Sequence, residues 1–146
     1  MNIEVVSFEQ LDNETLYQIL KLRVDVFVVE QNCPYPELDN KDQNAKHFFI
    51  KEGNEIVAYL RTYFKNENVL TIGRIITHIK HRGGGLSRQL INKAIETADK
   101  TTKSLFLQGQ THLQSFYESF GFEKISDSYL EDGIPHIDME LLLNNC

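Results

Sequence analysis

The stretch TIGRIITHIKHRGGGLSRQLINKAIETA, from Thr71 to Ala98, decides the fold of this chain. Its first residues are rich in β-branched side chains, which favour a buried strand. Three consecutive glycines, Gly83 to Gly85, then predict a turn. After the glycines, apolar residues recur at helical spacing, which predicts a helix with one buried stripe. The residues of this stripe are Leu86, Leu90, Ile91, Ala94, Ile95 and Ala98.

The glycine turn has the features of an anion site. The first turn of a helix has backbone N–H groups without intrahelical partners, and the helix dipole makes that end positive. From Thr77 to Lys93 the chain carries several basic residues and no acidic one, although the whole chain has a net charge of −6. A small basic patch on an acidic protein indicates a discrete anionic ligand and argues against nucleic acid as the main partner.

The glycine pattern narrows the choice of phosphate ligand. A Walker NTPase would need a lysine after the glycines, and a dinucleotide fingerprint would need glycine in place of Arg88. The turn instead matches R-x-x-G-x-[G/A/S], filled here by Arg82, Gly85 and Ser87. It resembles the pyrophosphate-binding turn of the GNAT acyltransferase superfamily, which binds acyl-coenzyme A. A tight strand-to-helix turn without a ligand is the alternative for this pattern taken alone.

Periodicity and turn residues predict the other elements. The expected strands cover Ile3–Phe8, His47–Ile50, Ile56–Phe64, a segment from Val69, Ser104–Leu107, Phe122–Ile125 and Ile134–Leu143. The expected helices carry apolar stripes at Leu16–Arg23 and Leu113–Phe120, the first capped by Asp12 or Asn13 and the second ended by Gly121. Val24–Val29 is interpreted as a continuation of the first helix or a second short one, and Glu37–Lys46 as a polar loop.

We therefore expect one domain over residues 1–146 with a mixed α/β (α+β) sheet flanked by helices and its ligand at the ends of the central strands. No run of 18 apolar residues occurs and the N-terminus lacks a secretory signal, which predicts a cytoplasmic protein without a membrane partner. The two cysteines, Cys33 and Cys146, are too few for a disulfide framework or a metal site.

Further motifs extend the resemblance over nearly the whole chain. HLQSFYESFGF, from His112 to Phe122, is similar to the second signature of the superfamily, in which a helix carries a tyrosine, here Tyr117, shortly before Gly-Phe. The segments VFVVEQNCPY, IGR and EDGIPHI resemble the ElaA-like branch of the same superfamily. This resemblance implies a GNAT-like, mostly antiparallel sheet.

The resemblance also implies the ligands and their sites. The donor would be acetyl-CoA, and the acceptor a small-molecule or peptide amine, with a homodimer as the assembly. The pyrophosphate would bind the N–H groups of Gly83, Gly84, Gly85, Leu86 and Ser87, with Arg82 adding charge. The pantetheine arm would pair with the strand edge at Ile75, Ile76 and Thr77. Ser87 departs from the usual glycine or alanine, but its side chain is small.

Transfer from a thioester to an amine needs an acid and a base. The resemblance places the acid that protonates the leaving thiolate at Tyr117; the alternative is a tyrosine of the apolar stripe bonded to backbone. Glu30 is the first candidate for the base, with a solvated helix-end glutamate as the alternative. The histidines that titrate in a suitable range are His47, His78, His112 and His136.

Other polar residues receive weaker assignments. Arg74, in a buried strand, should pair with an acid or contact the acceptor. Asp39 and Asp42 belong to a loop interpreted as solvated and acidic, which suits a cationic amine, and their spacing to His47 fits no standard metal site. Cys33 is a weak candidate nucleophile because no histidine is close in sequence. Gln108 and Gln110 either bind a ligand or cap the next helix.

Three classes of function follow from the sequence. The first is an N-acetyltransferase in which the amine attacks acetyl-CoA directly. The second is a CoA-binding sensor or interaction module without transfer activity, on the same fold. The third is a protein that binds the phosphates of another nucleotide. Retention of Tyr117 favours the enzyme, because a binding module has no need for an acid at the thiol.

Overall fold

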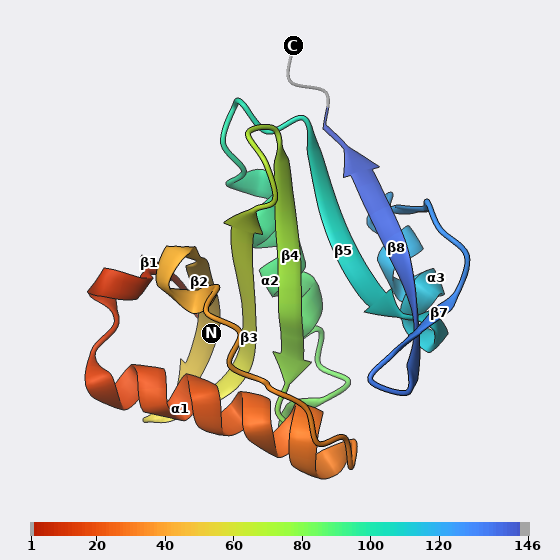
Figure 1. Cartoon of the computed structure of the whole chain (residues 1–146). Coiled ribbons are helices and arrows are strands. Elements are labelled where there is room, and N and C mark those ends of the chain that lie inside the picture. The colour runs from red at the N-terminus through yellow and green to blue at the C-terminus, as the bar shows by residue number, and fades with distance from the viewer. Residues whose placement is uncertain (1, 144–146) are drawn as a thin grey trace.

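A computed structural model describes residues 2–143 of the chain. These residues form one eight-stranded sheet with helices on both faces (Figure 1). The strands are β1 (Ile3–Ser7), β2 (Lys46–Glu52), β3 (Glu55–Phe64), β4 (Val69–Thr77), β5 (Ser104–Gln110), β6 (Glu123–Lys124), β7 (Tyr129–Glu131) and β8 (Ile134–Leu142). The α-helices are α1 (Asn13–Arg23), α2 (Leu86–Glu96) and α3 (Gln114–Glu118), with short 3-10 turns η1 (Phe8–Gln10), η3 (Asp42–Asn44), η4 (Ile79–His81) and η5 (Thr111–Leu113), and a π-helical segment η2 (Val24–Glu30).

The sheet is mixed and mostly antiparallel, as predicted. Its order is β1-β2-β3-β4-β5-β8-β6, with β7 paired to β8. Among the strands that the structure describes, only β4 and β5 run parallel, because α2 connects them as a crossover. The predicted helix after the glycine turn and the predicted cap at Asp12 are confirmed, because the Asp12 carboxylate accepts from the backbone N–H of Thr15. The second predicted helix ends earlier than expected: the C-cap of α3 is Ser119, and Gly121, with a positive φ, lies two residues beyond it.

Two cores lie on opposite faces of the sheet. The larger one packs α2 and α3 against the strands, with Leu90, Ile91 and Tyr117 among its members. The smaller one packs α1 against the other face through Ile19 and Leu22. The alternation of side chains along each strand supplies both cores from one sheet.

The centre of the sheet is open at one end. β4 and β5 pair only over Val69–Thr71 and Ser104–Phe106, and beyond these residues the two strands diverge (Figure 1). A bulge in β4 lies beside the opening, because Arg61 of β3 pairs with Gly73 while Tyr59 pairs with Ile76. Arg74, within the bulge, has a left-handed backbone with φ of 53°. The predicted ligand position, at the ends of the central strands, coincides with this opening.

Some element boundaries differ from the predictions. Val24–Glu30 does continue the first helix, but as a π-helix, with N–H groups bonding five residues back, as from Cys33 to Val28. The segment Gln108–Gln110 is not a junction, because β5 extends through it by pairing with β8. Within residues 2–143, no helix is long and apolar enough to cross a membrane.

Candidate active site

A pocket of about 1240 Å³ occupies the opening between β4 and β5. It reaches both faces of the sheet. On one face it is lined by the start of α2 and by α3, including Leu86 and Tyr117. On the other face it is lined by residues 31–45, which we call the strap, and by the hairpin of β7 and β8. The predicted cofactor residues of β4 and the turn also border it: Ile75, Ile76, Thr77, Arg82, Gly83, Gly85, Leu86 and Ser87. Gly84 belongs to the same turn but is not among the lining residues.

The glycine turn presents an open backbone to this pocket. Gly83 and Gly85 have φ of 87° and 80°, a left-handed conformation that favours glycine. Gly85 is the N-cap of α2 and no side chain caps it, so no side chain occupies the donors of the first turn. A Cβ at Gly83 or Gly85 would meet nothing within 4 Å, which shows that their Cβ positions are open. The Ser87 hydroxyl is bonded to that of Thr77 and is accommodated without disturbing the turn.

Arg82 fixes the position of the turn. Its Nε donates to the carbonyl of Thr77 at 3.0 Å, and its two Nη atoms donate to the Glu30 carboxylate at 2.7 and 2.8 Å. These bonds lower the pKa of Glu30, which keeps the carboxylate ionised and weakens it as a base. The structure thus gives Glu30 a partner that the sequence did not predict, and its role as general base stays a prediction.

Tyr117 lies on the opposite side of the pocket from the strap. Its ring packs on Gly109, where an added Cβ would come within 2.7 Å of the ring atom Cε2. Only 6% of the residue is exposed, and burial raises the pKa of Tyr117 to about 12. No protein partner for the hydroxyl is found among residues 2–143, so the alternative of a backbone-bonded core tyrosine is not what the structure shows. A protonated phenol facing the pocket is a competent acid.

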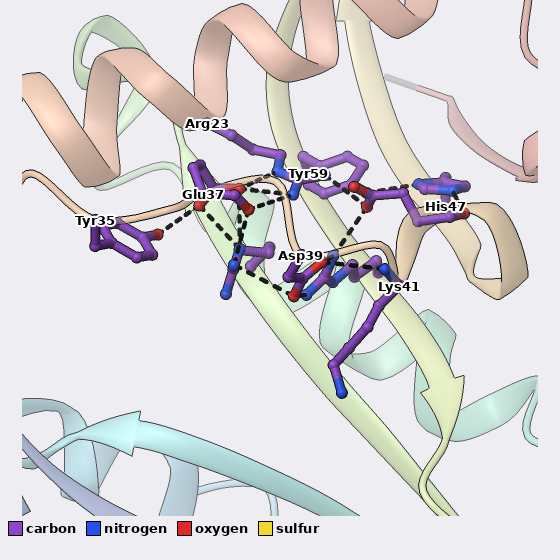
Figure 2. A network of polar contacts seen from close by, with 10 residues as sticks. Arg23, Tyr35, Glu37, Asp39, Lys41, His47 and Tyr59 are labelled. Atoms are coloured by element: carbon purple, nitrogen blue, oxygen red, sulfur yellow. Dashed lines mark hydrogen bonds and ion pairs between the residues drawn. The ribbon is translucent and has the colours of Figure 1, made fainter. Parts of the chain in front are cut away.

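The strap is held by a network of three arginines and three carboxylates, part of which Figure 2 shows. Arg23 of α1 donates to Glu37 through Nε at 2.8 Å and to Asp42 through Nη1 at 2.7 Å. Arg61 of β3 donates to Asp42 at 2.9 Å and binds both carboxylate oxygens of Asp39. The interpretation of this loop as solvated is therefore wrong, because Glu37 and Asp42 are buried and all three carboxylates are paired.

Arg74 joins the network from the bulge in β4. Its Nε lies 2.9 Å from Glu37 Oε1, and its Nη2 donates to the Glu37 carbonyl at 3.0 Å. The prediction that Arg74 pairs with an acid is confirmed. Because Asp39 and Asp42 are both bonded to arginines and the strap also carries Lys41, the strap offers no unpaired acidic charge to a cationic amine. That earlier expectation for Asp39 and Asp42 is corrected.

His47 serves this network and is not a metal ligand in the structure. It is fully buried, with Nδ1 2.6 Å from the Tyr59 hydroxyl and Nε2 2.9 Å from the Asp42 carbonyl. Burial lowers the pKa of His47, so the ring stays neutral. Within the described part of the chain, no group of three or more His, Cys, Asp or Glu side chains could hold a metal ion.

Comparison with known proteins agrees with this geometry. A family model described as an acetyltransferase (GNAT) domain matches residues 10–143. The chain belongs to the GNAT acetyltransferase family. A UPF0039 protein of Schizosaccharomyces pombe is 41% identical over 97% of this chain and 99% of its own length. ElaA of Escherichia coli is 41% identical over 89% of each chain.

Solved structures show the same family relationship. A structure described as an acyl-CoA N-acyltransferase from Pseudomonas aeruginosa superposes with a TM-score of 0.90 and 35% identity, covering 97% of this chain and 99% of that one. Escherichia coli ElaA superposes with a TM-score of 0.90 and 39% identity over the same shares. The GNAT family and the ElaA-like branch, inferred above from the glycine turn and the motifs around Glu30 and Gly133, are confirmed.

Several predicted residues of this GNAT domain meet on the strap side of the pocket. Gln110 donates to Gln31 of the strap at 3.3 Å, and the Cys33 thiol donates to the Asp132 carbonyl at 3.4 Å. Cys33 is buried and its thiol is bonded to this backbone carbonyl, and its weak candidacy as a nucleophile stays a prediction. His112 and His136 line the pocket, whereas His78 and His81 lie outside it near Glu55 and Glu52.

Sequence reasoning missed Arg23 and Arg61 as parts of the site. Both are essentially unexposed, at 0% and 2%. A usable signal was present, because each arginine lies in an apolar helix or strand, and a buried arginine requires a carboxylate partner. The loop carries three carboxylates, so the sequence could have predicted that it neutralises these arginines.

Proposed function

We propose that this GNAT family member is an N-acetyltransferase that moves an acetyl group from acetyl-CoA to an amine by direct attack. One observation carries the proposal: the uncapped glycine turn and the Tyr117 hydroxyl both line the pocket that opens between β4 and β5. A site for a phosphate-bearing thioester and an acid for its thiol are thus parts of a single cavity. The acyl-CoA N-acyltransferase title of a structural neighbour supports the same donor class.

The residues present fit an acyl-CoA. The N–H groups from Gly83 to Ser87 lie at the positive end of α2 and suit a pyrophosphate. The diverging edge of β4 at Ile75–Thr77 suits the amide groups of a pantetheine arm, which can pair as an added strand. Arg82 acts by holding the turn against Glu30 and Thr77, and its charge remains at the edge of the anion site.

The chemistry requires a neutral amine and a protonated leaving thiol. Tyr117 supplies the proton to the sulfur, because its phenol is protonated at neutral pH and no group within residues 2–143 hydrogen-bonds to its hydroxyl. The acceptor is a small-molecule or peptide amine that enters from the strap side, where the polar groups of Gln108 and Gln110 line the pocket. A homodimer stays a prediction.

The proposal is tested by a screen of amines with acetyl-CoA that measures released thiol. The panel contains polyamines, amino acids, aminoglycosides and peptides with free N-termini or lysines. We expect transfer to at least one class of amine. Binding of acetyl-CoA in calorimetry without transfer to any of these amines would instead support the CoA-binding module. A thermal shift with ATP larger than that with acetyl-CoA would support a different phosphate ligand.

The variant Tyr117→Phe separates the enzyme from the module. It removes the proton donor and preserves the ring that packs on Gly109. We expect kcat to fall by about 10²-fold or more, with the acetyl-CoA dissociation constant unchanged. Calorimetry measures the affinity and thiol release measures kcat. A kcat equal to that of the wild type would remove Tyr117 from the mechanism.

A further inference from the structure

The site described so far has an acid on one side and no assigned base on the other. Tyr117 belongs to the core that α2 and α3 form, so it marks the thiol side of the pocket. Glu30, the predicted base, has both oxygens bonded to Arg82. Any further base must therefore be sought among the titratable groups that line the strap side.

His136 lies on the strap side of the sheet. In the antiparallel pair of β5 and β8 it is directly opposite Gln110, and the neighbouring pair is Gly109 and Ile137. Opposed residues share a face and neighbours alternate. Gly109 contacts Tyr117, whereas Gln110 contacts Gln31 of the strap. Tyr117 and His136 are therefore on opposite faces of the sheet, and one pocket joins them.

The tautomer of His136 is set by its own hairpin. Nδ1 lies 2.7 Å from the carbonyl oxygen of Ile134. A carbonyl only accepts, so Nδ1 carries the hydrogen, and the neutral ring has its lone pair on Nε2. No protein group within residues 2–143 hydrogen-bonds to Nε2. The half-buried ring also stacks on Tyr129, with ring centroids 6.3 Å apart, and Tyr129 is bonded to Asp138.

We propose that His136 is the general base of the transfer reaction, receiving the proton of the acceptor ammonium on Nε2, directly or through one water. This inference rests on the proposed function. The neutral amine then attacks the thioester carbonyl carbon, so that a C–N bond forms as the C–S bond breaks. Tyr117 gives its proton to the departing sulfur and regains one from the nitrogen. The proton on His136 passes to solvent, and the net products are amide, free thiol and one proton.

The surroundings of His136 bear on its pH dependence. The titratable groups of the elements around it are Tyr129 and Glu131 of β7, Asp132 of the turn, Asp138 of β8, Cys33 of the strap, and, along the pocket, His112 and Glu30. Asp138 and Tyr129 bind each other, the Cys33 thiol binds backbone, and Glu30 binds Arg82. The side chains of Glu131, Asp132 and His112 have no hydrogen bond within residues 2–143, so no bond fixes their orientation, whereas the Ile134 carbonyl fixes the ring of His136 with its basic nitrogen free.

The test uses His136→Asn, which keeps an N–H donor near the Ile134 carbonyl and removes the basic nitrogen. With the most active amine of the screen, we expect kcat/KM to fall by about 10²-fold or more and the acidic limb of its pH profile to flatten. The acetyl-CoA dissociation constant should stay within twofold of the wild-type value, and added imidazole should restore part of the rate. The matched control His81→Asn, which lies outside the pocket near Glu52, should retain the wild-type rate and pH profile.

Other results would overturn the inference. An unchanged rate and profile in His136→Asn would do so, as would a comparable loss in Glu30→Gln or His112→Asn with His136→Asn unaffected. If the wild type transfers to no amine, the proposed function itself fails. Independently of any acceptor, long-range ¹H–¹⁵N spectra of the free protein should show hydrogen on Nδ1 of His136, and hydrogen on Nε2 of the neutral ring would contradict the assignment.

Discussion

The two sides of the pocket are built in opposite ways. On the side of the glycine turn, the proposed donor side, the structure has an open backbone, an uncapped helix and one ion pair, Arg82 with Glu30, whose side chains are 40% and 36% exposed. On the side of the strap, the proposed acceptor side, three arginines and three carboxylates that are largely buried hold the chain. A pyrophosphate needs free backbone N–H donors, whereas a pocket surface that recognises one acceptor needs side chains held in one position. This difference predicts that substitutions in the strap network reduce the free energy of unfolding more than substitutions in the glycine turn.

The largest effect is expected from breaking the strap network at Arg23. Arg23→Met removes one of the two arginines that bind Glu37 and one of the two that bind Asp42, so that three carboxylates share only two arginines. We expect the free energy of unfolding to fall by about 3–5 kcal/mol, measured by urea denaturation.

Lys21→Met is the matched control for Arg23→Met. It removes an ion pair with Asp25 whose side chains are both more than half exposed, and such surface pairs contribute little to stability. A similar small loss in Arg23→Met would show that the network does not stabilise the fold, and the contrast between the two sides would fail.

An intermediate effect is expected from acid. Burial alone would raise the pKa of Asp39, but the hydrogen bonds and charge of Arg61 outweigh burial and lower the pKa from 3.8 to about 2. A carboxylate whose folded pKa is depressed stabilises the protein above its unfolded pKa, and this contribution is lost as the pH falls from about 4 toward 2. We expect the difference in unfolding free energy between wild type and Asp39→Asn to shrink by up to about 2 kcal/mol over that range, measured by denaturation at several pH values. A difference that does not change with pH would show that Arg61 does not bind Asp39 in solution.

The smallest effect on stability is expected at the glycine turn. Gly83→Ala places a side chain at φ of 87° with no neighbour within 4 Å, so only backbone strain opposes it, at about 1 kcal/mol. Acetyl-CoA affinity should fall tenfold or more, because the turn must change to relieve the strain. Calorimetry and thermal unfolding measure the two effects.

Gly53→Ala provides the control for the turn. Gly53 has φ of 64° and is likewise without neighbours within 4 Å, but it lies in the β2–β3 turn, away from the pocket. Its loss of stability should match that of Gly83→Ala, and its acetyl-CoA affinity should equal that of the wild type. Equal affinities in both variants would remove the turn from the binding site.

The donor side could be predicted from the sequence, and the acceptor side could not. Consecutive glycines, a following apolar stripe and a local excess of basic residues are all short-range signals, so Arg82 to Ser87 and α2 were placed correctly. The strap network joins Arg23, Arg61 and Arg74 to carboxylates 14 to 37 residues away, and no local pattern encodes which partner each finds. The tautomer of His136 depends likewise on a hairpin that brings Ile134 into reach. The overall fold was predictable because it depends on periodicity. The side-chain pairing was not predictable, since it depends on tertiary packing.

The parting of β4 and β5 has a consequence beyond catalysis. Unpaired strand edges at the rim of a sheet invite association with other chains. Here two such edges lie inside the sheet, between strands that pair with each other at one end and diverge at the other. A strand of another protein has little room there, whereas a narrow, extended ligand can enter. A bound donor that hydrogen-bonds there would complete the sheet as a temporary ninth strand. Amide hydrogen exchange in β4 and β5 should then slow whenever the donor is present, so that the substrate also stiffens the middle of the fold.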